Sequence, residues 1–286
     1  MRKNKFWILF GLTILLSLGS QLLAQANRIL TIAPTAQASS IGNVMLPMMN
    51  PARNLYNKDK FSFSRVNWMT NIVNDMSYNF IDFDRGPFGV NVMFFNYGEQ
   101  NQADEYGIIQ GQFTPLSAVY GFNYARKIDK YNLGFDAKII THDLHTQSAK
   151  GLVLGIGAYF PKVYKDLYLD VMVQNFGFAP KFRGTKSELP TSVNVAGTYP
   201  YEDFMFYGQF NKMKEHQTFG MGTSYNYKNM LWGKLGYYMD GAHELTYPTF
   251  GLDFKYDKYL IGMSYIYGDK TLPLSNTIRL TINLEL

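Results

Sequence analysis

The chain has 286 residues, of which 47% are hydrophobic and 17% charged, and it contains no cysteine. This hydrophobic content excludes a disordered chain, and a mean hydropathy of −0.17 is too low for a bundle of membrane helices. The formal net charge of +5 includes Arg2, Lys3 and Lys5, and no basic cluster interleaved with aromatic residues comes after them, so nucleic-acid binding is not supported. The missing cysteine excludes disulfides, a cysteine-ligated zinc and a lipid anchor on cysteine.

Residues 1–24 are expected to form a signal peptide. Met1 to Lys5 is basic, Phe6 to Gly19 is a mostly apolar run of about fourteen residues, and small residues occur after it at Ala24 and Ala26. A membrane-spanning helix needs about twenty apolar residues, and no later run reaches that length. An uncleaved N-terminal anchor is the alternative. If the protein sits in a membrane, strands must hold it there.

Residues 25–60 differ in character from the rest of the mature chain. Ala33 to Ser40 is small and polar, Met45 to Met49 is apolar, and Asn50-Pro51-Ala52 favours a turn in which Pro51 starts a short helix. A segment of this size cannot fold alone. We expect it to be a small plug that leans on the domain formed by residues 61–286, with Asn50, Pro51 and Ala52 as its structural motif.

From Phe61 onward, apolar residues alternate with small or polar ones. In residues 277–286 one face holds Ile278, Leu280, Ile282, Leu284 and Leu286, and the other holds Thr277, Arg279, Thr281, Asn283 and Glu285. In residues 217–227 Phe219 and Met221 oppose Gly220 and Gly222. This alternation predicts about fourteen strands, at residues 61–70, 76–82, 88–97, 116–126, 131–141, 151–160, 167–175, 191–199, 204–211, 217–226, 231–240, 249–256, 259–267 and 276–286.

The connections between these strands alternate in length. Tight ones fall at residues 127–130, 200–203, 227–230 and 257–258, and longer ones at 98–115, 176–190, 241–248 and 268–275. Outer-membrane barrels have short periplasmic turns and longer outer loops. We therefore expect an all-β fold, a transmembrane antiparallel β-barrel of about fourteen strands in the outer membrane of a Gram-negative bacterium, surrounded by lipid, with the plug at its periplasmic mouth.

A soluble secreted β-sandwich or propeller is the competing interpretation. Tyrosines crowd the predicted strand ends, as at Tyr225, Tyr227, Tyr256 and Tyr259, and interfacial aromatic belts are typical of membrane barrels. No repeat of fixed period supports a propeller. The membrane barrel is the favoured interpretation.

The sequence offers no convincing catalytic, cofactor or metal site. His142, Asp143 and His145 fall in a predicted loop without an organised third ligand, which is weak evidence for a metal. His216 and His243 fall in two other loops. Ser224, Ser264 and His243 cannot be brought together from the sequence, so a serine hydrolase is unsupported. We expect a non-enzymatic protein that needs no cofactor.

A family resemblance rests on the plug segment. Ile41-Gly42-Asn43, then Asn50-Pro51-Ala52, then about fourteen strands resemble the FadL-like barrels, and within them the PorV/PorQ family of type IX secretion in Bacteroidetes. Gln25, just after one cleavage point, is similar to exported proteins of that group. The resemblance covers essentially the whole mature chain.

This resemblance implies two functions. The PorV/PorQ likeness implies a component of type IX secretion or related surface export that binds secreted cargo proteins and other secretion-system components. Phe176, Phe178 and Phe182, set among basic residues, suit such contacts. The wider FadL-like likeness implies passive transport of hydrophobic solutes. Transport needs a hydrophobic pocket behind the plug and a lateral gap in the wall. Met45 to Met49 can line such a pocket, although these residues are also suited to the core of the plug.

Overall fold

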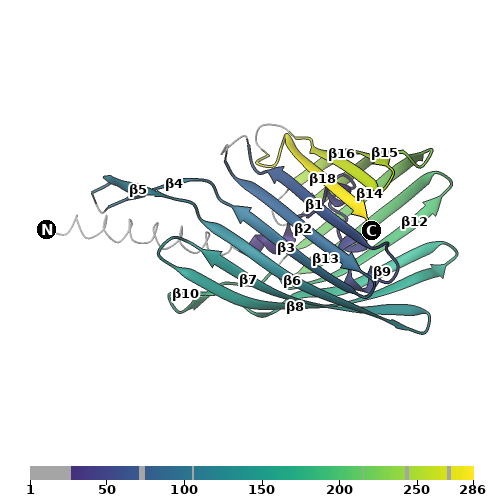
Figure 1. Ribbon diagram of the computed structural model, residues 1–286, viewed down its shortest axis with the longest axis horizontal. Helices are drawn as coiled ribbons and strands as arrows, with labels where there is room; N and C mark the ends of the chain where they lie inside the picture. The colour runs from purple at the N-terminus through teal and green to yellow at the C-terminus, as the bar shows by residue number, and fades with distance from the viewer. Residues whose placement is uncertain (1–26, 71–74, 105, 215, 242–244, 269–271) are drawn as a thin grey trace.

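The computed structural model describes residues 27–70, 75–104, 106–214, 216–241, 245–268 and 272–286. The predicted signal peptide lies outside them. Fourteen antiparallel strands form one closed barrel (Figure 1), which confirms the expected fold. Within the described ranges, no helix is both long and apolar enough to cross a membrane.

The barrel strands are β1 (Lys60–Asn67), β2 (Ser77–Arg85), β3 (Phe88–Asn96), β6 (Leu116–Ile128), β7 (Tyr131–Asp143), β8 (Ser148–Tyr164), β9 (Leu167–Phe178), β12 (Ser192–Tyr201), β13 (Phe204–Met213), β14 (Gln217–Tyr227), β15 (Leu231–Asp240), β16 (Leu245–Tyr256), β17 (Tyr259–Ile266) and β18 (Thr277–Glu285).

The barrel closes because the first strand pairs with the last. β1 lies antiparallel to both β2 and β18, with Phe63 opposite Ile81 on one side and Ile282 on the other. Every other strand of the barrel pairs with two neighbours. No barrel strand is left with an open edge, so its backbone groups can be satisfied in a medium without water.

The two faces of each strand differ as the alternation predicted. On β18, Leu280 is 54% exposed on the outer face, whereas Thr281 is 1% and Arg279 2% exposed on the inner face. The outer surface carries large apolar side chains on every side, and the lumen is lined by buried Asn, Asp, Lys, Ser and Thr. An apolar exterior around a polar interior requires lipid as its surroundings. The protein is therefore an outer-membrane β-barrel.

The two ends of the barrel differ. At one end, here called the short-turn end, two or three residues join strands, as between Tyr164 and Leu167 or Tyr256 and Tyr259. Tyr164, Tyr201 and Tyr256 are exposed there by more than half of their surface, as in an interfacial aromatic belt. The opposite end, here called the long-loop end, carries most of the longer connections.

The long connections hold structure that the alternation did not predict. Residues 98–115 form a hairpin of β4 (Gln100–Ala103) and β5 (Ile109–Phe113), which extends beyond the barrel (Figure 1), and residues 176–190 contain the hairpin of β10 (Lys181–Phe182) and β11 (Thr185–Lys186). β16 begins at Leu245, four residues before the expected position. β16 can contain Pro248, which has no N–H to donate, because the neighbouring strand β17 ends at Ile266. On the side of β17, the backbone oxygen of Pro248 accepts a bond from the Tyr267 N–H (3.1 Å).

Candidate functional site

The segment before β1 lies inside the barrel. It consists of η1 (Asn27–Thr31), α2 (Ala36–Ser39), α3 (Leu46–Met49) and η2 (Pro51–Arg53), joined by irregular chain. Asn27 contacts residues of the long-loop end, whereas Lys58 pairs with Glu285 near the short-turn end (2.8 Å). The plug therefore runs through the lumen and is not confined to the periplasmic mouth where we expected it. The domain boundaries at residues 24 and 60 stay predictions.

Glycines on the inner wall let the plug come close. A Cβ on Gly236 of β15 would stand 2.1 Å from the backbone N of Gly42, and one on Gly220 of β14 would stand 2.2 Å from the Gly42 O. On β7, a Cβ on Gly134 would lie 2.1 Å from the Ala52 N. Real Cβ atoms do not approach so closely, so these wall positions require glycine while the plug is seated.

At the long-loop end, a buried polar cluster holds the plug. The Nδ2 of Asn27 donates to the Ser187 Oγ (2.9 Å) and the Glu188 O (2.5 Å), and its Oδ1 lies 3.1 Å from the Nε2 of His142. The Nδ1 of His142 lies 2.6 Å from the Ser117 Oγ. Because the amide oxygen can only accept, Nε2 carries the proton, and in the neutral imidazole Nδ1 then accepts from the serine hydroxyl. We call this set of residues the outer latch.

The outer latch corrects the expectation for the histidines. His142 is 1% exposed on β7, which extends two residues beyond its expected end at residue 141, to Asp143. Ser117, His142 and Asn27 differ from a Ser-His-Asp triad, because Nδ1 rather than Nε2 of His142 faces the serine and the third group is an amide. Ser117 is also 0% exposed and lines none of the three hollows of the lumen. The arrangement therefore holds the plug rather than a substrate.

The other candidate residues for chemistry are dispersed. His145 stacks on Phe113 in the outer loops, with 4.8 Å between the ring centroids. His216 lines the lumen at the long-loop end, and Ser224 lines it at the short-turn end. His243 lies outside the described residues. Within the described ranges, no three His, Asp or Glu side chains are grouped so as to hold a metal ion.

The predicted plug motif, Asn50, Pro51 and Ala52, lies against β7, β8 and β9. Asn50 caps η2 by accepting a bond from the Ala52 N (3.1 Å), and Pro51 occupies the first position of that turn. The Nδ2 of Asn50 donates to the Ala158 O and the Asp170 Oδ1, both at 3.0 Å. The motif thus joins the turn of the plug to the wall.

Arg53, which the sequence analysis did not single out, also joins this part of the plug to the wall. We call Asn50, Arg53 and Asp170 the inner anchor. Its Nε and Nη2 donate to both carboxylate oxygens of Asp170, with the shortest contact at 2.6 Å, and the guanidinium lies 4.4 Å from the centroid of the Tyr159 ring. The two charged side chains are 8% and 0% exposed. The sequence contained two signals for this ion pair. Arg53 directly follows the plug motif, and Asp170 falls on the lumenal face of a predicted membrane strand.

Three hollows lie along the inner face of β13. An outer vestibule of about 800 Å³ at the long-loop end is lined by Asn211 and Met213, among others. An inner hollow of about 390 Å³ at the short-turn end is lined by Met205 and Tyr207. Between them lies a central cavity of about 30 Å³, and Gln209 lines both it and the vestibule.

α3 and Met45 divide these hollows. Met45 lines the vestibule and the central cavity, and Met48 lines the inner hollow. The backbone N of Leu46 donates to the Oε1 of Gln209 (2.8 Å), which fixes α3 to β13. The methionine segment is thus both plug core and cavity lining, the two roles left open by the sequence.

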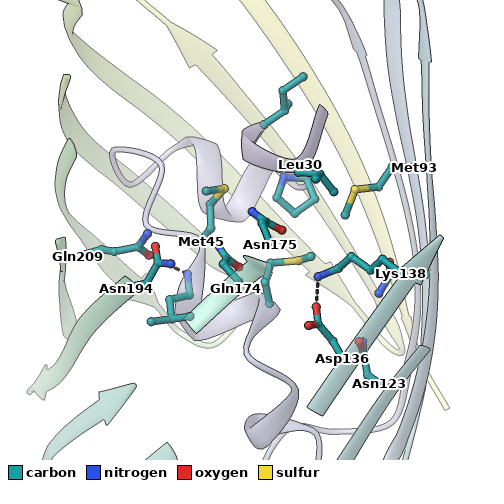
Figure 2. Close-up of a pocket in the computed structure, with 15 residues that line it drawn as sticks. Leu30, Met45, Met93, Asn123, Asp136, Lys138, Gln174, Asn175, Asn194 and Gln209 are labelled. Carbon is teal, nitrogen blue, oxygen red and sulfur yellow. Dashed lines mark hydrogen bonds and ion pairs between the residues drawn. The ribbon is translucent and has the colours of Figure 1, made fainter. Parts of the chain in front are cut away.

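The central cavity has two chemically different sides, which Figure 2 shows. The plug supplies an apolar side made of Leu30, Ile32, Pro34, Met45, Leu46 and Met49. The wall supplies a side that is polar except for Met93 of β3, and it includes Asn91, Asn123, Asn194, Gln209 and the ion pair of Lys138 with Asp136.

Comparison with known proteins supports the fold. No protein-family model and no curated protein sequence matches the chain. Among solved structures, the toluene transporter TodX of Pseudomonas putida aligns over 87% of this chain and 96% of its own at 12% identity, with a TM-score of 0.56. The toluene transporter TbuX of Ralstonia pickettii aligns over 87% of this chain and 96% of its own at 11% identity, with a TM-score of 0.53. The monoaromatic hydrocarbon channel CymD aligns over 88% of this chain and 95% of its own at 9% identity, with a TM-score of 0.57.

These neighbours are described as transporters and channels rather than enzymes. At such low identity the likeness shows the fold alone, the barrel that this chain shares with TodX, TbuX and CymD. The narrower resemblance to PorV/PorQ is not supported by these matches.

Proposed function

We propose that this barrel is a passive transporter of hydrophobic small molecules across the outer membrane. The observation that carries the proposal is the row of three hollows along β13, with Met45 and residues of α3 among those that line them. Of the four residues of α3, Leu46 and Met49 line the central cavity and Met48 lines the inner hollow. The structural neighbours TodX and TbuX, both toluene transporters, add support.

Uptake of toluene into proteoliposomes tests this proposal. The double variant Met45→Ala with Met49→Ala shortens two side chains of the divider, and we expect faster uptake than with the wild type. Met230→Ala is the matched control, because Met230 is exposed in a turn at the short-turn end. Uptake no faster than in empty liposomes would refute transport, and equal rates in all three proteins would refute the role of α3.

A second proposal is that the barrel binds secreted cargo and other components of type IX secretion. It is favoured by the β4–β5 hairpin, which projects beyond the barrel (Figure 1) and exposes Tyr106 (81%), Ile108 (61%) and Ile109 (60%). Exposed apolar groups at a projecting tip suit contact with a protein. In the Phe176–Pro190 loop, Phe178 is 72% exposed and supports this proposal, whereas Phe182 is buried and does not.

A deletion strain separates the two functions. Normal surface display of secreted proteins together with reduced uptake of hydrophobic compounds supports transport. Reduced display with normal uptake supports the secretion role. Removing residues 100–113 from the intact gene would then show whether the hairpin is needed for display.

A further inference from the structure

The outer face of β8 shows where the hydrocarbon core of the membrane ends. Its outward side chains are apolar from Leu152 to Phe160, and lysines stand before and after this stretch at Lys150 and Lys162. A strand needs about 9–11 residues to cross the hydrocarbon core, and this stretch has that length. Lys150 therefore lies at the membrane surface of the long-loop end. This end faces the outer leaflet, since the short turns of outer-membrane barrels face the periplasm.

Phe178 lies at the same level on the neighbouring strand. It is the partner of Leu152 in the pairing of β8 with β9, and it is 72% exposed. The ring is therefore at the outer edge of the apolar band, where the acyl chains of the outer leaflet meet their headgroups. Aromatic side chains at this depth typically lie against lipid.

The β10–β11 hairpin, which follows β9, carries two lysines on one face. Lys181 and Lys186 are direct partners across the hairpin, and both are exposed. Phe182, the next residue after Lys181, has to point to the other face. Phe182 is buried against His142 of the inner wall, with 5.8 Å between the ring centroids. The two lysines therefore point away from the lumen.

No acidic side chain balances these two lysines. Like charges directly opposite each other destabilise a strand pair. Among the described residues, no ion pair includes either lysine, and Glu188, two residues after Lys186, pairs with Lys214 instead (3.5 Å). The Cβ atoms of opposed residues lie about 5 Å apart, so both ammonium groups can reach one anion. An anion bound there would offset the repulsion between them.

The hairpin begins at the level of the membrane surface. Pro180, directly before β10, packs on β8, since a Cβ on Gly151 would stand 2.8 Å from the Pro180 Cδ. Gly151 is the neighbour of Lys150, and β10 lies beside β8 at the rim of the barrel (Figure 1). The rim therefore places lysines at the headgroup level and an exposed phenylalanine at the level of the acyl chains.

We propose that this rim binds a phosphorylated lipid of the outer leaflet. Lys150, Lys181 and Lys186 contact its phosphate groups, and an acyl chain lies on Phe178. Ammonium groups are suitable partners for phosphate, and a single amphipathic molecule uses both parts of the rim. A free anion would use the lysines alone, and a neutral lipid the phenylalanine alone. The site lies on the outside of the barrel, so the inference does not depend on the transport function.

Binding of lipid A, a glycolipid that carries phosphates, tests the proposal. The purified full-length mature protein in a neutral detergent is titrated with lipid A and with dephosphorylated lipid A, and the bound lipid is counted by native mass spectrometry. We expect saturable binding of lipid A and binding of the dephosphorylated form that is about 30-fold weaker. Inorganic phosphate at the same concentration should not displace the lipid.

The double variant Lys181→Gln with Lys186→Gln removes both charges and should weaken binding of lipid A about 30-fold. Phe178→Ala removes only a contact with the acyl chain, so it should weaken binding of both forms of the lipid by the same factor. The matched control is Lys127→Gln with Lys130→Gln, which makes the same change of charge at an exposed turn of the short-turn end. This control should bind lipid A as the wild type does.

Lys150→Gln is a variant outside the hairpin, in case the double variant does not fold, and it should weaken binding about fivefold. Each other result overturns the inference. Equal binding of both forms of the lipid would mean that only acyl chains are held, and displacement by inorganic phosphate would mean that a free anion is held. Equal losses in the test and control variants would mean unspecific attraction to a basic protein. A change in oligomeric state of the double variant without lipid, measured by light scattering, would mean that the rim contacts a second copy.

Discussion

Replacing Gly236 by alanine should unseat the plug while leaving the barrel closed. A Cβ at this position would stand 2.1 Å from the Gly42 N and 2.3 Å from the Ile41 C. Both are backbone atoms, so no side-chain rotation relieves the overlap. The plug residue at this contact is equally restricted. A Cβ on Gly42 would lie 2.4 Å from the Tyr237 O, and its φ of +74° favours glycine.

The size of the effect can be worked out from the overlap. Inserting a methyl group into a packed interior costs about 1–3 kcal/mol, which corresponds to about a 5- to 150-fold shift away from the seated plug. Displacement also breaks the bond from the Gly42 N to the Thr249 Oγ1 (3.0 Å). The strand pairs of β15 with β14 and β16 do not depend on the plug, so the barrel itself should persist.

The control is Gly233→Ala on the same strand. A Cβ on Gly233 would meet nothing within 4 Å, because this residue faces outward. Ion conductance in planar bilayers and protease sensitivity of the plug should rise for Gly236→Ala and stay at the wild-type level for Gly233→Ala, while both variants keep heat-modifiable migration. Equal behaviour of the two variants would show that the wall glycines do not seat the plug.

Three further changes test other parts of the structure. Arg53→Leu leaves the Asp170 carboxylate buried without its cation, which should cost about 3–5 kcal/mol and lower the temperature at which the folded band disappears in a gel-shift series. Leu280→Arg places a charge on the lipid face at a cost of about 2–4 kcal/mol and should reduce assembly, whereas Thr281→Ser keeps the lumenal hydroxyl and should assemble normally; equal yields would contradict the assigned faces. Asn27→Leu removes the outer latch and should speed cleavage of the plug by protease, and an unchanged rate would show that the latch does not hold it.

The strands could be predicted from the sequence because their signal is local. Every one of the fourteen barrel strands lies at a predicted segment, since the alternation of apolar and polar residues is a property of each strand by itself. The ends were less predictable. β8 runs from Ser148 to Tyr164 rather than from 151 to 160, because strands extend past the lipid wherever a neighbour continues to pair with them.

The path of the plug could not be predicted, because it depends on contacts between distant parts of the chain. Gly220 and Gly222 were placed on the inner face from the alternation alone. Nothing local indicated that they would face Gly42 and Ile41, about 180 residues earlier in the chain. Likewise, His142 and Asn27 each lack a recognisable motif, and only the closed barrel brings them together in the outer latch.

The distribution of these contacts determines which part of the plug moves most easily. The inner anchor holds one end through a buried ion pair, and the outer latch holds the other through buried hydrogen bonds. α3 lies between them with four residues and no side-chain cap, and among the described residues one hydrogen bond, from the Leu46 N to Gln209, joins it to the wall. Breaking one neutral bond costs about 0.5–1.5 kcal/mol, much less than separating Arg53 from Asp170. For the transport that we propose, a shift of α3 is therefore a less costly way to open a path along β13 than expulsion of the plug.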